Sequence, residues 1–167
     1  DETYDDIRLR GKVTKSDAKA EEIINNMKNS FEEIKNAVKN EPPKKVYIEI
    51  SPLEFGLWTC GKKTFHQELF DICNITNIFA DLEGWQEISE EQVIAKNPDI
   101  ILTTCATYMQ NGLSAAQEIM QRKNWQGITA VINKDVYEVD ESIMTHPAPR
   151  LVDAARELVK IVYEKDI

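Results

Sequence analysis

The chain has 167 residues, which suits one domain with enough apolar content for a real core. It carries 20 lysines and arginines against 29 acidic residues, and a formal net charge of -9 argues against a nucleic-acid partner, because phosphate contacts need basic surface. No apolar run approaches the roughly 18 residues of a membrane span. The start, "DETYDDIRLRGK", holds no recognisable signal peptide, and this abrupt beginning leaves export of the natural protein open.

A long amphipathic helix is expected over about residues 16–40. Its apolar residues recur at steps of three and four, which places them on one face. They are Ala20, Ile23 or Ile24, Met27, Phe31, Ile34 and Val38. Ser16 is a good N-cap, and Pro42-Pro43 ends the helix. At 1.5 Å per residue the helix spans roughly 36 Å, which is long for a packing helix and reasonable for a strut.

Behind residue 43 the pattern alternates between strands and helices. Strands are expected at 45–50, 99–104, 128–133 and 136–140, and helices at 65–73, 89–96, 112–121 and 150–163. This alternation predicts an α/β fold, a mostly parallel sheet flanked by helices in a Rossmann-like lobe, preceded by the long backbone helix.

Ligands of open sheets bind at the carboxyl ends of the strands, which here lead into the loops 51–63, 105–111 and 140–150. We expect the first loop to be long and irregular. Its Trp58 either offers a flat apolar surface to a ligand or, with its neighbours, closes over the domain's own core. In the last loop, two prolines stiffen the backbone after His146, which either serves structure alone or holds that histidine toward a ligand.

The stretch "GWQEISEEQ" places Trp85 in a loop that leads into a helix. Ser89 and Gln92 form a capping box, and the helix dipole alone accounts for acidic residues in the first turn. However, between Asp81 and Glu91 there are five acidic residues and no basic one. A local negative patch of this kind is suited to meet an arginine on a partner.

Motifs of catalysis are absent from the sequence. It contains no G-x-G-x-x-G, no G-x-x-x-x-G-K-[ST], no G-x-S-x-G and no H-E-x-x-H. Cys60, Cys73 and Cys105 are widely spaced without a C-x-x-C, as expected of ordinary, partly buried thiols. We therefore expect no enzymatic activity, no cofactor and no resident metal.

Four stretches, in this order, resemble the C-terminal half of the class III solute-binding proteins that serve ABC importers for iron-siderophores, haem and cobalamin. They are "IRLRGKVT", "GKKTFHQELFDICNITNIFAD", "WQEISEEQVIAKNPDIILTT" and "PAPRLVDAARELVKIVY". Together they cover residues 5 to 164. The third is the most specific, because it fixes a tryptophan, a capping serine and a glutamate in one register.

The resemblance implies two α/β lobes joined by one long, rigid helix, with the ligand held in the cleft between them. Residues 1–42 would form the connecting segment with the inter-lobe helix, and 43–167 the C-terminal lobe, while the N-terminal lobe is absent from this chain. Phe31 and its neighbours would then expose apolar surface that the other lobe covers.

The resemblance also implies roles for individual residues. Trp58 and Trp85 match positions where an aromatic side chain lies against the ligand, and Thr145 and His146 fall in the last loop, which contacts the ligand. Glu91 matches the glutamate that pairs with an arginine of the membrane permease. No arginine or tyrosine cluster typical of the capture of anionic iron chelates is evident in this half.

The implied function is capture of an iron complex (siderophore or haem) or cobalamin, and its delivery to the ABC permease. The implied location is extracytoplasmic, in the periplasm or at the cell surface, with membrane association through the permease or a lipid anchor.

Two alternatives stay open. A zinc- or manganese-binding protein shares the strut helix, and its metal would need histidines and aspartates or glutamates converging at the cleft, with His66 and His146 as the histidine candidates. A metallocluster enzyme subunit shares the lobe architecture, and Cys60, Cys73 and Cys105 would ligate its cluster.

Overall fold

A computed structural model describes residues 2–109, 112–140 and 150–167 of the chain. Its α-helices are α1 (Glu2–Val13), α2 (Asp17–Val38), α3 (Phe65–Ile72), α4 (Glu90–Lys96), α5 (Ala115–Gln121), α6 (Thr129–Asn133) and α8 (Leu151–Tyr163). Its strands are β1 (Lys45–Glu49), β2 (Leu57–Cys60), β3 (Thr76–Asn77), β4 (Trp85–Ile88), β5 (Ile100–Thr103) and β6 (Val136–Glu138). Short 3-10 helices are η1 (Leu53–Phe55), η2 (Cys105–Tyr108) and η3 (Lys123–Trp125). Within these ranges, every helix is too short or too polar to cross a membrane.

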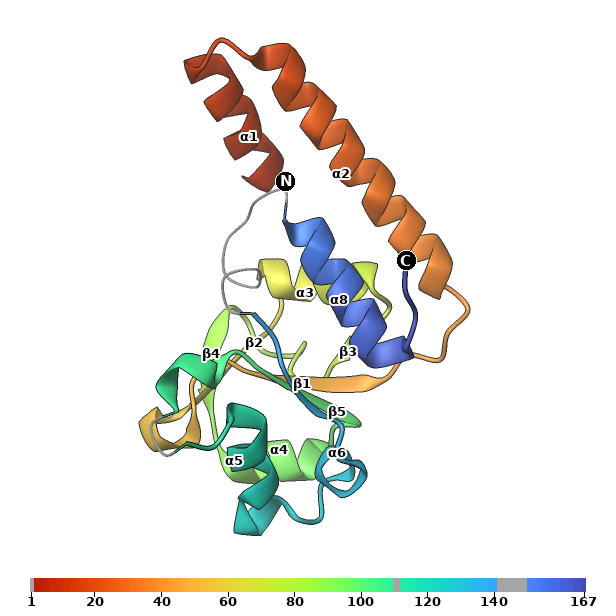
Figure 1. Cartoon of the computed structure of the whole chain (residues 1–167). Coiled ribbons are helices and arrows are strands. Elements are labelled where there is room, and N and C mark those ends of the chain that lie inside the picture. Colours follow the sequence, from red (N-terminus) through yellow and green to blue (C-terminus); the bar gives the residue numbers. More distant parts are fainter. Residues whose placement is uncertain (1, 110–111, 141–149) are drawn as a thin grey trace.

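The central sheet of the described chain has the strand order β3-β1-β5-β6, and all its pairings are parallel. Helices α3 and α8, with the end of α2, cover one face, and α4, α5 and α6 cover the other (Figure 1). The expected α/β fold, a mostly parallel sheet with helices on both faces, is confirmed.

Two apolar clusters fill the layers on either side of the sheet, since successive residues of a strand point to opposite faces. In β1, Val46 and Ile48 belong to the cluster under α2, α3 and α8. Tyr47, between them, belongs to the cluster with α4, α5 and α6. By the same alternation, Glu49 points into the second layer. The chain therefore carries a carboxylate into a core, at the carboxyl end of a buried strand.

The long helix α2 buries the apolar face that the spacing predicts, from Ala20 to Val38. Ser16 is not the side-chain cap we expected, because its hydroxyl donates to the Thr14 carbonyl oxygen at 3.2 Å. Phe31 is only 8% exposed, so the expectation that it presents open apolar surface is wrong in this chain.

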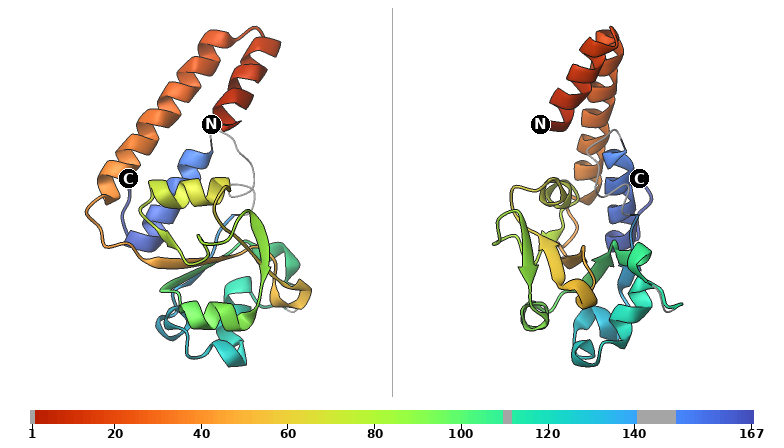
Figure 2. Two further views of the ribbon diagram at one scale, coloured as in Figure 1. Left: turned by 180° about the vertical axis from the view of Figure 1, so that it is seen from behind. Right: turned by 90° about the vertical axis from the view of Figure 1, so that its left-hand side faces the viewer.

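Helix α1 was not predicted within the connecting segment. It folds back along the first half of α2, and the two helices rise away from the sheet (Figure 2). Gly11 permits this close approach, because a Cβ at that position would lie 2.6 Å from the Cβ of Ala20. The long strut is therefore paired with a second helix over part of its length.

Strands β2 and β4 form a separate antiparallel pair, where we expected a long irregular loop and a loop carrying Trp85. Leu57, Thr59 and Ile88 are buried on one face of this pair. Four-residue strands carry little periodic signal, and their pairing joins segments far apart in the chain, so the sequence did not indicate it.

The expected strand at 128–133 is also wrong, because Thr129–Asn133 forms helix α6. The Asn97 side chain accepts a hydrogen bond from the backbone N–H of Thr129 at 2.8 Å, and the Pro98 carbonyl accepts one from Ala130 at 3.1 Å. These contacts hold the turn on the second apolar cluster, while β6 takes the place beside β5. A short apolar run does not distinguish a buried strand from a buried helical turn.

Candidate functional site

Four aromatic side chains of the described residues are more than a third exposed, and they gather at one edge of the lobe. They are Phe55 (58%), Trp58 (39%), Trp85 (42%) and Tyr108 (42%). Phe55 and Tyr108 lie in η1 and η2, which follow the carboxyl ends of β1 and β5, and their ring centroids are 6.1 Å apart. The two tryptophans lie in β2 and β4 beside them (Figure 1). This is the edge where open parallel sheets bind ligands.

The register of β2 and β4 places both tryptophans on the same face. Trp58 pairs with Glu87, and Cys60 pairs with Trp85. Residues that are paired, or that are two apart in one strand, share a face. The sequence singled out Trp58 and Trp85 separately, and the structure brings them together.

The ring of Trp85 is held by aromatic contacts from the start of α3. It meets His66 edge to face, with centroids 4.9 Å apart, and Phe65 at 6.4 Å. Thr64 caps α3 by accepting a hydrogen bond from the Gln67 backbone N–H at 3.3 Å, as the sequence predicts. His66 itself is fully buried, so Trp85 rather than this histidine reaches solvent at the edge.

Glu91 lies exposed in the first turn of α4. The capping box is confirmed, because the Ser89 hydroxyl accepts from the Gln92 backbone N–H at 3.3 Å and the Gln92 side chain accepts from Ser89 at 2.8 Å. A hydrogen bond from its own backbone, with one from the Ser89 side chain, lowers the pKa of the Glu91 carboxyl. Helix α4 lies below the sheet and α3 above it (Figure 1), so Glu91 in α4 and the Trp85 ring, which packs on the start of α3, lie toward different sides of the lobe.

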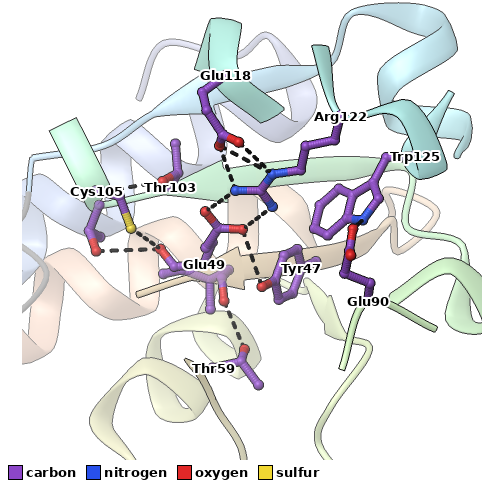
Figure 3. Close-up of polar contacts among 11 residues, drawn as sticks. Tyr47, Glu49, Thr59, Glu90, Thr103, Cys105, Glu118, Arg122 and Trp125 are labelled. Carbon is purple, nitrogen blue, oxygen red and sulfur yellow. Dashed lines mark hydrogen bonds and ion pairs between the residues drawn. The ribbon is translucent and has the colours of Figure 1, made fainter. Parts of the chain in front are cut away.

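A buried ion network, which the sequence analysis missed, lies at the carboxyl end of β1 (Figure 3). The Arg122 guanidinium donates to both oxygens of Glu49, at 2.7 and 2.9 Å, and to Glu118 at 2.6 Å. Its Cζ lies 4.4 Å from the ring centroid of Trp125. The Trp125 indole N–H donates to Glu90 at 2.8 Å. The network thus ties α5 and η3 to both the sheet and the first turn of α4.

The centre of this network is closed to solvent, since the side chains of Arg122 and Glu49 are 3% and 1% exposed, whereas Glu118 at its rim is 32% exposed. Burial alone would lower the pKa of Arg122, but the hydrogen bonds that it donates to the two carboxylates outweigh it and raise that pKa, so the guanidinium stays charged. A glutamate inside a buried strand requires such a partner, so Glu49 in the strand pattern signals that a cation is needed, although not that it is Arg122.

The cysteines do not form a cluster site. All three are free thiols and are fully buried, more so than we expected. Burial raises the pKa of both Cys60 and Cys73 to about 12. Among the described residues, no group of three histidine, cysteine or acidic side chains is placed to hold a metal ion. Neither metal-based alternative therefore gains a ligand set from this part of the chain.

Of the five site residues that the sequence predicts, the structure describes three. Trp58 and Trp85 lie on the same face of the strand pair and are both partly exposed, although Cys60 on that face is buried, and Glu91 is exposed on α4. Thr145 and His146 lie outside the described residues, so their contact with a ligand stays a prediction.

Comparison with known proteins identifies the family. The family model described as periplasmic binding protein matches residues 1–143. The ABC transporter substrate-binding lipoprotein YvrC of Bacillus subtilis is 32% identical over 97% of this chain and 50% of its own length. The vitamin B12-binding protein of Vibrio cholerae is 23% identical over 95% of this chain and 54% of its own. The chain thus spans about half the length of these curated relatives.

A solved structure has the same fold. It is that of a possible iron-binding (periplasmic solute-binding) protein of Staphylococcus epidermidis, with a TM-score of 0.84 and 30% identity over 97% of this chain and 62% of the other. Periplasmic proteins and a lipoprotein among the relatives confirm the extracytoplasmic location that the sequence resemblance implies. The chain belongs to the periplasmic binding protein family, whose members bind substrates for transport.

Proposed function

We propose that the chain is part of the solute-binding component of an ABC importer, and that its aromatic edge forms one wall of the ligand site. The observation that carries this proposal is the shared, exposed face of Trp58 and Trp85. Two large flat apolar rings left in solvent suit a large ligand with its own apolar surface, since aromatic faces contribute most where water is displaced.

The ligand class is an iron complex, as a siderophore or haem, or cobalamin. Family membership supports a transported solute, and relatives named for vitamin B12 and for iron support these two chemistries. Binding rather than catalysis is proposed, because the aromatic edge offers surface and shape to a ligand and the matched family binds substrates for transport. The last loop, with Thr145 and His146, would complete the wall from the same lobe.

The domain arrangement is part of the proposal. Helix α2 would join residues 43–167, as the C-terminal lobe, to a second lobe outside this chain, and the ligand would lie between them. The match to about half of each curated relative supports this reading. Membrane association would come through the permease or through a lipid anchor, as the name of the Bacillus subtilis relative indicates for that protein.

Titration of the intact protein tests the ligand site. We expect cyanocobalamin, haemin or a ferric siderophore to quench the tryptophan fluorescence saturably. Trp58→Ala and Trp85→Ala are each expected to weaken binding about tenfold or more, because buried aromatic anchors dominate binding energy. Trp125→Phe is the control, since that ring is fully buried in the core. Absence of saturable binding by all of these ligands would refute the proposal.

Glu91 is proposed to dock the protein by pairing with an arginine of the permease. Its exposure and its lowered pKa support a charged, available carboxylate. A charge-assisted pair adds orientation as well as attraction. We expect Glu91→Ala to leave ligand affinity within about twofold while reducing uptake several-fold, and Glu83→Ala, which removes another exposed acid, to change neither. Equal loss of ligand binding and uptake in Glu91→Ala would remove the docking role.

A further inference from the structure

Glu87 shares the exposed face of β2 and β4 with the two tryptophans. It pairs directly with Trp58 across the strands, and it lies two residues after Trp85 in β4. Both relations place its side chain on the aromatic face, while Ile88, the next residue, is buried on the other side. A carboxylate therefore lies within the surface proposed to hold the ligand.

The backbone opposite Glu87 makes room for this carboxylate. Gly56 has a φ of 88°, and a Cβ at that position would lie 2.8 Å from Oε1 of Glu87. Glycine is the residue that adopts such a φ without strain, and it also leaves the space that the carboxylate fills. The carboxylate thus lies against the start of the strand that carries Trp58.

The other acidic residues of this segment have described partners. Asp81 pairs with Lys96 at 3.1 Å, Glu83 pairs with Lys63 at 2.6 Å, Glu90 accepts from the Trp125 indole at 2.8 Å, and Glu91 accepts from the Ser89 side chain. For Glu87, the described part of the chain provides no hydrogen bond and no ion pair to the carboxylate. Its acceptors are available to a ligand.

Two lysines of this edge lie beside residue 83. Lys63 forms the ion pair with Glu83, and Lys62 forms a backbone bridge with the same residue. In the register of the two strands, residue 83 lies beyond Trp85, whereas Glu87 lies opposite Trp58. Glu87 therefore adds a negative charge to the aromatic face next to Trp58.

We infer that Glu87 is a specificity-determining residue, which selects ligands that present N–H donors, as amide or ammonium groups, beside their apolar surface. An ionised carboxylate only accepts hydrogen bonds, so it rewards such donors and repels carboxylate or catecholate oxygens. Aromatic rings on the same face exclude water and strengthen both effects. This inference rests on the proposed function, because it assigns the ligand chemistry of the same site.

Four probes of different charge test the assignment in the intact protein. Cyanocobalamin has a rim of neutral primary amides, and ferrioxamine B carries a free ammonium group. Haemin carries two carboxylates, and ferric enterobactin is a triply negative tris-catecholate. The readout is a ratio of two affinities, obtained from tryptophan quenching at low and high salt. Its numerator is the affinity for the tighter-binding N–H donor probe, and its denominator is the affinity for the tighter-binding anionic probe.

The wild type is expected to favour an N–H donor probe. Glu87→Gln should lower the affinity ratio about tenfold, because one charge-assisted contact and one like-charge repulsion are lost together. Glu87→Lys should lower it further, and added salt should reduce the wild-type preference. Glu83→Gln is the matched control, since it removes the same charge two residues before Trp85 and should leave the ratio within about twofold.

The outcomes separate this inference from the proposed function. Saturable binding with an unchanged ratio in Glu87→Gln overturns the role of Glu87 and leaves the proposed function standing. A wild type that binds haemin or ferric enterobactin most tightly has the same consequence. If no probe binds, both proposals fail.

Discussion

The buried network beneath the sheet and the exposed face of β2 and β4 use the same kinds of side chain in opposite ways. Beneath the sheet, Trp125 is fully buried, its indole N–H donates to Glu90, and Arg122 is held by two carboxylates. On the exposed face, Trp58 and Trp85 stand partly in solvent beside the carboxylate of Glu87. Both regions combine tryptophan with acidic side chains. Only in the buried network do these polar groups find their hydrogen-bond and ion-pair partners within the described chain.

The difference separates structural groups from candidate binding groups. A buried polar group that finds its hydrogen bonds is explained by the fold, because leaving it unpaired would cost stability. The fold explains the exposed aromatic rings only in part, and it gives the Glu87 carboxylate no described partner, so these groups are the candidates for contact with a ligand. Mutations in the buried network should therefore mainly lower stability, whereas mutations on the exposed face should mainly weaken ligand binding.

The largest effect on stability is expected for Arg122→Met. This change leaves Glu49 as an uncompensated charge inside the lobe, and breaking a buried pair costs about 3–5 kcal/mol. Urea unfolding followed by far-UV circular dichroism measures the loss. Removing both charges, in Glu49→Met with Arg122→Met, should recover most of it.

An exposed ion pair provides the control for this prediction. Lys63 and Glu83 are 71% and 58% exposed, so Lys63→Met should cost less than about 1 kcal/mol. Equal losses for Arg122→Met and Lys63→Met would contradict the view that the network beneath the sheet is the structural one.

A second, smaller loss is expected for Trp125→Phe. The smaller ring leaves a void and removes the indole N–H that reaches Glu90, which together cost about 2–3 kcal/mol in unfolding free energy. Trp85→Phe is the matched change on the exposed face, and it should cost less than about 1 kcal/mol because that ring is 42% exposed. A larger loss of unfolding free energy in Trp85→Phe than in Trp125→Phe would contradict the assignment of the buried network to stability.

Gly61→Ala should lower the free energy of unfolding by about 2 kcal/mol, because it disturbs the backbone next to β2. A Cβ at residue 61 would lie 2.3 Å from the Leu82 carbonyl oxygen, which is backbone and has little freedom to move. Urea unfolding of the variant and of the wild type measures the loss of stability, and ligand titration of the intact protein measures the effect on binding at the exposed face. Gly127→Ala is the control, since no heavy atom lies within 4 Å of a Cβ there; a loss as large as that of Gly61→Ala would show that the effect is not steric.

The sequence predicted best what local patterns specify. The periodic apolar face of α2, the capping box at Ser89 and the buried strand β5 depend on residues close together in the chain, and each is confirmed. The most specific of the four stretches that carry the family resemblance is of this kind, since Trp85 and Glu91 have a fixed spacing in it. Elements whose signal is local and repeated are the ones that sequence reasoning recovers.

What it missed depends on distant partners. Glu49 and Arg122 are 73 residues apart, and the sequence does not indicate which cation answers a buried glutamate. The pairing of β2 with β4 is similarly non-local, and so is the coincidence of Trp58 and Trp85 on one face. The sequence predicted two ligand-binding tryptophans, whereas the carboxylate between them became evident only from the register.

The smallest stability effect is expected for Trp58→Ser, and it decides between the two explanations that the sequence left open for this tryptophan. As a lid over the domain's own core, Trp58 would cost about 3–5 kcal/mol to truncate. As a ligand surface, with 39% of the residue exposed, it should cost about 1 kcal/mol or less, while weakening ligand binding in the intact protein. Urea unfolding and fluorescence titration of the same variant measure both quantities. A large loss of stability with unchanged affinity would show that Trp58 covers the domain's own core. Of the two exposed tryptophans, only Trp85 would then remain in the proposed ligand wall.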